Sequence, residues 1–258
     1  MQESAVLFTM PESSPQHEPT PEYLAAVDRA EELVRLQAQA QKRKSMLVFG
    51  AQGVGKTRLL HEFVKSQPLA LYVEQTHSPR ELMLSIMEAL HRIAKRELHL
   101  PANPASLSTS SLKGVIQRSL DMSPFLLVLD QLSGPSRIVT GIIKDLNYYG
   151  RTPVFFAART PHMEDIGTLQ PMCSDRSERV EVKNLASPIA REFAQREAES
   201  TVLWASNLEA VLHYFVERSE GNPASILQMV KMAHLPKYRM DDQIKAHVLY
   251  LDYIMGRR

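Results

Sequence analysis

Short apolar runs alternate with longer amphipathic stretches through the middle of the chain. The apolar runs are rich in β-branched residues, aromatic residues and leucine, and each is short enough for one strand. They read MLVFG, LALYVE, FLLVLD, PVFFAA and RVEV, at residues 46–50, 69–74, 125–130, 153–158 and 179–182. Because parallel strands need crossover connections, usually helices, this alternation predicts an α/β fold with a parallel sheet flanked by helices on both faces.

The pattern changes after Leu185, where four stretches have helical character and no strand is predicted between them. These stretches are residues 187–200, 206–221, 222–233 and 240–255. We therefore expect a C-terminal all-helical domain.

The chain before the first strand divides into two parts. Residues 1–21 hold four prolines among scattered polar residues, which predicts a flexible tail. Apolar residues then recur near helical spacing, which predicts an amphipathic helix carrying Leu24, Val27, Leu33 and Leu36. The expected organisation is a tail (1–21), an α/β domain (22–185) and a helical domain (186–258).

One motif carries most of the chemistry. GAQGVGKT, from Gly50 to Thr57, fits the pattern G-x-x-x-x-G-K-[ST] and stands between an apolar strand and a helix. Its glycines let backbone N–H groups face phosphate oxygens, Lys56 reaches the β- and γ-phosphates, and Thr57 ligates Mg²⁺. The residues predicted to bind nucleotide here are Gly50, Ala51, Gln52, Gly53, Val54, Gly55, Lys56, Thr57 and Arg58.

A second acidic position complements this loop. PFLLVLDQL ends an apolar strand in Asp130, which predicts a carboxylate that holds Mg²⁺ together with Thr57. The next residue is Gln131, whose amide orients a water but cannot accept its proton as a glutamate does. Slow hydrolysis is expected, unless an acid such as Glu74 supplies the base.

Together these residues resemble the AAA+ and STAND P-loop ATPases, in the branch of origin-recognition, ExeA-like secretion and transposition-helper ATPases, over residues 22–233. The resemblance implies ATP and Mg²⁺ as cofactors. AAVDRAEELVRL is similar to the helix that opens this domain in the family. Asp28 and Arg29 stand where the family usually has a Gly-Arg pair. At the end of PVFFAART, Arg159 is the implied γ-phosphate sensor, with Thr160 as a polar alternative.

The resemblance also assigns residues outside the sheet's centre. Arg176 and Arg179 are the two implied arginine fingers, acting on a neighbouring subunit of a homo-oligomer. VERSEGNPASILQMV resembles the lid segment that closes over adenine, where Gly221 ends one helix and Pro223 begins the next. Ala224 replaces the arginine that many relatives have, which is closer to the STAND type.

The composition of the chain bears on its cellular location but does not identify a partner. The 258 residues carry a net charge of +1, which argues against global attraction to nucleic acid or membrane, although residues 41–44 (QKRK) and the terminal GRR are local basic contacts. The single cysteine, Cys173, cannot form an intramolecular disulfide, and no apolar run approaches the roughly 20 residues of a membrane span. A cytoplasmic location without membrane contact is expected.

Three functions fit these features. The first is an ATP-dependent switch or slow ATPase whose bound nucleotide, ATP or ADP, controls assembly with a protein partner. The second is a DNA-associated helper that assembles on duplex with ATP, using the core, residues 42–44 or a partner, because the chain after the lid is too short for a winged helix. The third is a small-molecule kinase, which the position of the lid after the last strand disfavours.

Overall fold

The computed structural model describes residues 29–74, 78–94, 98–148 and 151–256. The predicted tail, residues 1–21, and the start of the predicted N-terminal helix lie outside these ranges. The described part of that helix, α1, runs from Ala30 to Gln41.

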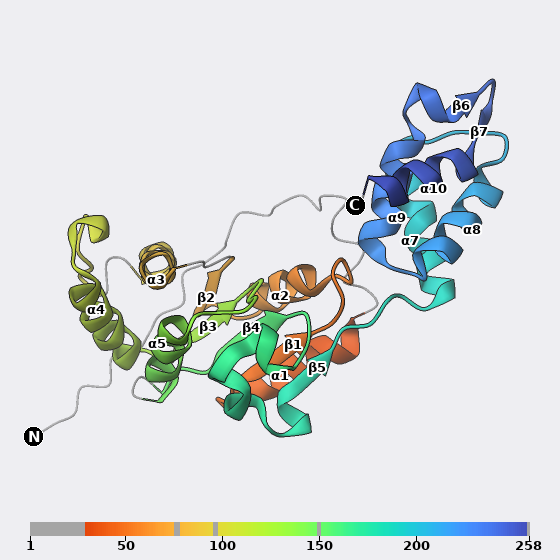
Figure 1. The fold of residues 1–258 in the computed structure, drawn as a ribbon. Helices are drawn as coiled ribbons and strands as arrows, with labels where there is room; N and C mark the ends of the chain where they lie inside the picture. The colour runs from red at the N-terminus through yellow and green to blue at the C-terminus, as the bar shows by residue number, and fades with distance from the viewer. Residues whose placement is uncertain (1–28, 75–77, 95–97, 149–150, 257–258) are drawn as a thin grey trace, which may run out of the picture.

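A five-stranded parallel sheet forms the centre of the molecule (Figure 1). The strands follow the order β2-β3-β4-β1-β5. They are β1 (Met46–Phe49), β2 (Ala70–Val73), β3 (Leu126–Leu129), β4 (Val154–Ala158) and β5 (Arg179–Glu181), and every pair is parallel. The predicted α/β fold class is confirmed. Strand β4 lies between β1 and β3, so the two strands that lead to Gly50 and Asp130 are not direct neighbours.

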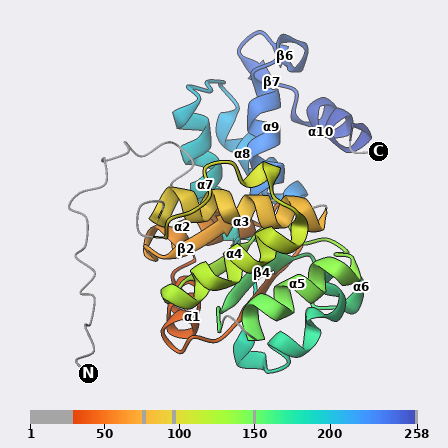
Figure 2. The same ribbon diagram turned by 90° about the vertical axis from the view of Figure 1, so that its left-hand side faces the viewer.

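Helices cover both faces of this sheet. Helix α1 and helix α2 (Lys56–Lys65) bury Leu36, Leu59 and Phe63 against one face. The other face carries α3 (Pro79–Ala94), α4 (Thr109–Met122) and α5 (Arg137–Tyr148), and Figure 2 turns this face toward the viewer. Strands buried on both sides need apolar residues at nearly every position, which explains the continuous apolar runs in the sequence.

Short elements connect β4 to β5. They are α6 (Met163–Ile166), η3 (Gly167–Cys173) and η4 (Arg176–Glu178). A further short helix, η2 (Pro104–Ser106), lies between α3 and α4. Cys173 is buried in the core beside α5, where burial raises the pKa of its thiol.

The C-terminal helices, which we call the lid (residues 187–256), have a hydrophobic core of their own. Helices α7 (Ser187–Ser200), α8 (Leu208–Ser219), α9 (Pro223–Ala233) and α10 (Ala246–Met255) form it. In Figure 1 they stand apart from the sheet, joined to it by the segment after β5. Among the described residues, no helix has the length and apolarity needed to cross a bilayer.

The prediction of one continuous helix over residues 240–255 is wrong in its first part. After the short helix η5 (Pro236–Tyr238), strands β6 (Arg239–Met240) and β7 (Gln243–Ile244) form an antiparallel hairpin. Asp241 turns the chain with a positive φ of 53°, a conformation that interrupts a helix. The Asn207 side chain bonds both the N–H and the C=O of Ile244 at 3.0 Å, which fixes the hairpin against the lid.

Candidate functional site

The phosphate loop leaves the carboxyl end of β1 and enters α2 at Lys56. Gly55 precedes the helix with a φ of 100°, and the first N–H groups of any α-helix have no partner within the helix. Together with the helix dipole, these N–H groups form a site suited to an anion such as phosphate. Ala51 and Gln52 are exposed, Gly50 and Val54 are buried, and Gly53, Gly55, Lys56, Thr57 and Arg58 are half-buried.

Lys56 points back into this loop. Its Nζ donates to the carbonyl oxygens of Gly50 at 2.7 Å and Ala51 at 2.9 Å. Burial lowers the pKa of this ammonium, the charge of Asp130 opposes the shift, and that of Arg159 adds to it. A phosphate oxygen would give the ammonium a stronger, charge-assisted partner than the two neutral carbonyls.

Asp130 follows β3 and is almost fully buried, with 3% of its surface exposed. Its Oδ1 accepts from the Gln131 backbone N–H at 2.8 Å, and its Oδ2 accepts from the Tyr72 hydroxyl at 3.1 Å. Burial and the charge of Asp130 raise the pKa of Tyr72, so the phenol remains a neutral donor. The carboxylate is thus held by two hydrogen bonds beside the phosphate loop.

The oxygen ligands of Asp130 and Thr57 suit Mg²⁺, which prefers hard oxygen donors. Among the described residues, no group of three or more His, Cys, Asp or Glu side chains could hold a metal without help. Mg²⁺ bound here would therefore take its remaining ligands from phosphate and water, as Mg²⁺ commonly does in nucleotide sites.

Arg159 and Thr160, the two predicted γ-phosphate sensors, face different partners. Arg159 follows β4, and its Nη2 donates to Gln52 Oε1 of the phosphate loop at 3.3 Å. Its backbone oxygen also accepts from the Gly50 N–H at 3.2 Å. Thr160 instead donates to Asp165 Oδ2 at 2.6 Å. Of these two side chains, Arg159 is thus the one that bonds the phosphate loop.

Two residues considered for activating water lie at the same edge of the sheet. Gln131 is exposed directly after Asp130 and has a positive φ of 54°. Glu74 is exposed at the carboxyl end of β2. The carboxyl ends of neighbouring parallel strands meet at one edge, so both residues lie near Asp130 in the fold.

The lid touches the phosphate loop directly. The Asn222 side-chain amide donates to the Gln52 carbonyl at 2.9 Å, and the Ala224 backbone N–H donates to the Gly53 carbonyl at 3.2 Å. Gly53 has a φ of 82°, and a Cβ there would lie 2.7 Å from Asn222 Oδ1 and 2.8 Å from Ala224 Cβ. Only glycine permits this approach. Pro223, the predicted adenine contact, is buried in the first turn of α9.

Arg29 joins the phosphate loop to the segment that leads into the lid. The side chain is buried, and its Nη2 donates to the carbonyls of Lys183 at 2.6 Å and Val54 at 3.2 Å. Its Nη1 pairs with Glu32 at 3.3 Å. The Arg29 guanidinium therefore holds loop and linker together, while Asp28 lies outside the described residues.

The two predicted arginine fingers are placed differently. Arg179 begins β5, and its Nε donates to the Cys173 carbonyl at 2.5 Å, so its side chain is tied to its own subunit. Arg176 is exposed on η4, and its side chain has no hydrogen bond or ion pair within the described residues. Arg176 is therefore the better placed of the two to reach a neighbouring molecule.

Three contacts of the site were not predicted from the sequence: those of Tyr72, Arg29 and Asn222. Each joins residues far apart in the chain: Tyr72 and Asp130 are separated by 58 positions, and Asn222 and Gln52 by 170. The one local signal was Asn222 before Pro223, since asparagine is a preferred N-cap, and its Oδ1 does accept from the Ser225 N–H.

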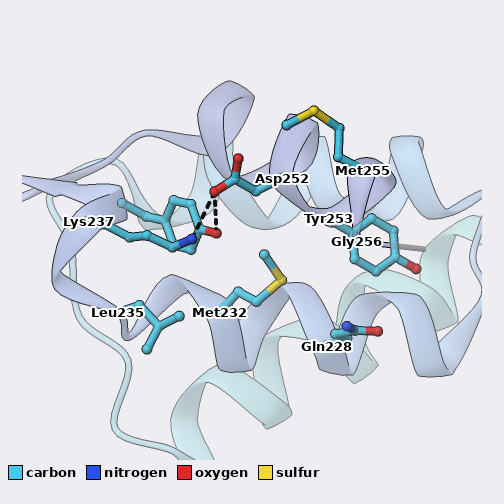
Figure 3. Close-up of a pocket in the computed structure, with 9 residues that line it drawn as sticks. Gln228, Met232, Leu235, Lys237, Asp252, Tyr253, Met255 and Gly256 are labelled. Atoms are coloured by element: carbon cyan, nitrogen blue, oxygen red, sulfur yellow. Dashed lines mark hydrogen bonds and ion pairs between the residues drawn. The ribbon is translucent and has the colours of Figure 1, made fainter. Parts of the chain in front are cut away.

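A separate groove lies on the lid and includes none of these residues (Figure 3). It encloses about 520 Å³ between α9, η5 and α10. Met232, Leu235, Tyr253 and Asp252 line it, and Asp252 Oδ2 accepts from Lys237 Nζ at 2.9 Å and from the Tyr238 hydroxyl at 2.9 Å. The groove is thus largely apolar with one ion pair.

Comparison with known proteins agrees with this arrangement. No protein-family model and no curated protein matches the sequence. A Walker-type ATPase of Pyrococcus abyssi is similar in structure (TM-score 0.60, 16% identity, 89% of this chain and 74% of that one). Domain III of the replication initiation protein DnaA from Thermotoga maritima is also similar (TM-score 0.55, 14% identity, 90% of this chain and 95% of that one). Cdc6p from Pyrobaculum aerophilum is similar as well (TM-score 0.55, 11% identity, 87% of this chain and 63% of that one).

At these identities the likeness establishes the fold. The chain shares with these structures the fold of a five-stranded parallel sheet with helices on both faces and a helical C-terminal part. The resemblance seen in the sequence is confirmed at this level.

Proposed function

We propose that the protein binds ATP with Mg²⁺ and acts as a nucleotide-dependent switch or assembly factor that hydrolyses ATP slowly. The observation that carries this proposal is that Lys56 and Arg159 both donate to the phosphate loop, Lys56 to the Gly50 and Ala51 carbonyls and Arg159 to Gln52 Oε1. The Asp130 carboxylate is buried at the same edge of the sheet. A cation, a buried carboxylate and a second cation around unpaired helix N–H groups form a site for a polyphosphate with its metal.

Each residue has a distinct role in this proposal. Lys56 and the loop N–H groups hold the β- and γ-phosphates, while Asp130 and Thr57 hold the Mg²⁺ that neutralises phosphate charge. Arg159 contacts the γ-phosphate and so distinguishes ATP from ADP. Gln131 orients the attacking water without accepting its proton, which keeps turnover slow.

The lid contacts support a switch. Asn222 and Ala224 donate hydrogen bonds to the carbonyls of Gln52 and Gly53, so a change in the conformation of the phosphate loop changes the position of the lid. A ligand shifts a protein between arrangements only as far as it binds one better than the other, and γ-phosphate contacts exist only with ATP. ATP and ADP are therefore expected to favour different positions of the lid.

Equilibrium titration with ATP and ADP, each with and without Mg²⁺, tests the proposal. Light scattering on the same samples reports assembly. Saturable binding that Mg²⁺ strengthens, with a mass that depends on the nucleotide, is the expected result. A protein that binds neither nucleotide at millimolar concentration contradicts the function.

The metal role of Asp130 gives a separate prediction. Asp130→Ala should weaken ATP binding in the presence of Mg²⁺ by about 10-fold or more, because a ligand to the metal is lost. Binding in EDTA should change little. Isothermal titration calorimetry in both conditions measures the difference, and equal losses with and without Mg²⁺ would place Asp130 outside the metal shell.

The exposed position of Arg176 predicts how assembly affects hydrolysis. If subunits meet as in related AAA+ assemblies, Arg176→Ala should lower turnover by about 10³-fold or more at high protein concentration, the usual effect of an arginine finger, and leave nucleotide affinity unchanged. Arg179→Ala should instead lower thermal stability, because its guanidinium holds the Cys173 carbonyl. A strictly monomeric protein under every nucleotide condition would remove the finger role.

A DNA-associated helper is the second candidate function. Four basic residues, Lys42, Arg43, Lys44 and Arg151, are exposed near the amino ends of the strands, opposite the phosphate loop. Arg43 fixes this group by donating to the carbonyls of Pro124 at 2.8 Å and Arg151 at 3.0 Å. Phosphate contacts of such cations are sensitive to salt. Adding duplex oligonucleotide with ATP to the light-scattering experiment tests whether DNA drives assembly.

A further inference from the structure

Tyr72 and Asp130 meet because of the register between two strands. Strands β2 and β3 run parallel with Tyr72 opposite Val128, and Asp130 is two residues further along the same face. The Asp130 backbone N–H donates to the Val73 carbonyl at 2.9 Å, which extends this register beyond the strand. The Tyr72 hydroxyl reaches Asp130 Oδ2 at 3.1 Å.

The hydrogen bond has a fixed direction. A carboxylate only accepts, so the Tyr72 hydroxyl donates. The other oxygen, Oδ1, accepts from the Gln131 N–H, and both side chains are buried, with 9% of Tyr72 and 3% of Asp130 exposed. Two donors on two oxygens leave the Asp130 carboxylate one orientation, and its remaining lone pairs are available to a metal.

The Tyr72 ring is itself held between the sheet and the helix that follows the phosphate loop. His61 of α2 lies against it, with ring centroids 4.5 Å apart and planes inclined by 37°. His61 is four residues after Thr57, so the two side chains share one face of α2. The residue that orients Asp130 thus packs against the face of α2 that carries Thr57.

We propose that Tyr72 is a positioning residue for Mg²⁺ at the phosphate site, where its hydroxyl fixes the Asp130 carboxylate toward the metal. This rests on the proposed function, because it needs a nucleotide with its metal at the loop. Partners that orient a metal ligand typically contribute about 10–100-fold to metal affinity. Tyr72 acts through Asp130 and touches neither nucleotide nor metal.

The test uses Tyr72→Phe, which removes only the hydroxyl. The full-length protein is titrated with Mg²⁺ at a fixed, subsaturating concentration of ATP, and nucleotide binding is followed by calorimetry or with a fluorescent ATP analogue. The variant should need about 10–100-fold more Mg²⁺ for the half-maximal increase in ATP affinity. Its affinity for ATP in EDTA should stay within about twofold of wild type, which a general structural defect would not allow.

Tyr238→Phe is the matched control. Tyr238 also donates to an aspartate, Asp252 Oδ2 at 2.9 Å, but on the lid groove. This variant should keep the wild-type Mg²⁺ titration. A double variant, Tyr72→Phe with Asp130→Ala, should be no weaker in Mg²⁺ than Asp130→Ala alone, because the hydroxyl acts only through the carboxylate.

The outcomes separate the two proposals. If wild type binds ATP with Mg²⁺ enhancement and the Tyr72→Phe titration coincides with it, the role of Tyr72 is refuted and the proposed function stands. An equal loss of ATP affinity with Mg²⁺ and in EDTA also refutes it. So does a double variant that loses more affinity in Mg²⁺ than Asp130→Ala alone. If wild type does not bind ATP, both proposals fail.

Discussion

Lys56→Ala should abolish detectable ATP binding while leaving the protein folded. The ammonium is the cation of the phosphate loop, and each charge-assisted hydrogen bond is worth on the order of 1.5–3 kcal/mol. Losing two such bonds weakens binding by about 10²–10⁴-fold. In the structure the Lys56 Nζ donates to the Gly50 and Ala51 carbonyls of its own loop, so the substitution leaves the packing of sheet and helices in place and the fold should not suffer. Equilibrium titration and thermal unfolding measure the two effects.

Lys65→Ala serves as the control for this variant. Lys65 is at the other end of α2, where its Nζ pairs with Glu62 at 2.9 Å on the surface. Removing it deletes the same charge from the same helix but leaves the loop intact. Its ATP affinity should equal that of wild type. Wild-type affinity in Lys56→Ala would mean that the loop does not hold the triphosphate.

Gln131→Glu should accelerate ATP hydrolysis. A carboxylate accepts the proton of the attacking water and an amide does not, and general-base assistance typically contributes about 10²–10⁴-fold. Single-turnover hydrolysis, with each protein saturated in Mg²⁺-ATP, measures the chemical step. The backbone at this position already has a φ of 54° with a non-glycine residue, so glutamine and glutamate should fit the turn equally well.

Glu74 provides the alternative to this prediction. If wild type already turns over quickly and the glutamate variant is no faster, another residue supplies the base. Glu74, exposed at the end of β2, is then the first to test by Glu74→Gln. A large loss in that variant would replace the picture of a slowly hydrolysing switch with that of an ordinary ATPase.

The sheet and the phosphate loop were predictable because their signals are local. An apolar run of four to six residues predicts a strand without knowledge of its neighbours, and the loop is defined by eight consecutive residues from Gly50 to Thr57. The residues that produce each structure are consecutive in the chain and can be identified without the rest of the fold. The fold class and the strand positions therefore agree with the structure.

The partners of the site residues were not predictable because they depend on three-dimensional register. A shift of one residue between β2 and β3 would turn the Tyr72 ring to the other face of the sheet, and no feature of LALYVE fixes that register. The contact between Asn222 and Gln52 likewise needs the lid to be placed on the loop. The hairpin near Asp241 was missed because its apolar spacing also fits a helix.

Under the proposed function, the direct bonds between the lid and the phosphate loop would link nucleotide affinity to binding elsewhere on the lid. The Ala224 and Asn222 donors join α9 to the loop, and α9 also forms one side of the lid groove. By thermodynamic reciprocity, any molecule that binds the groove and prefers one lid position changes the affinity for nucleotide by the same factor as the nucleotide changes its own. If the lid switches as proposed, a molecule in the groove would respond to the bound nucleotide without contacting phosphate.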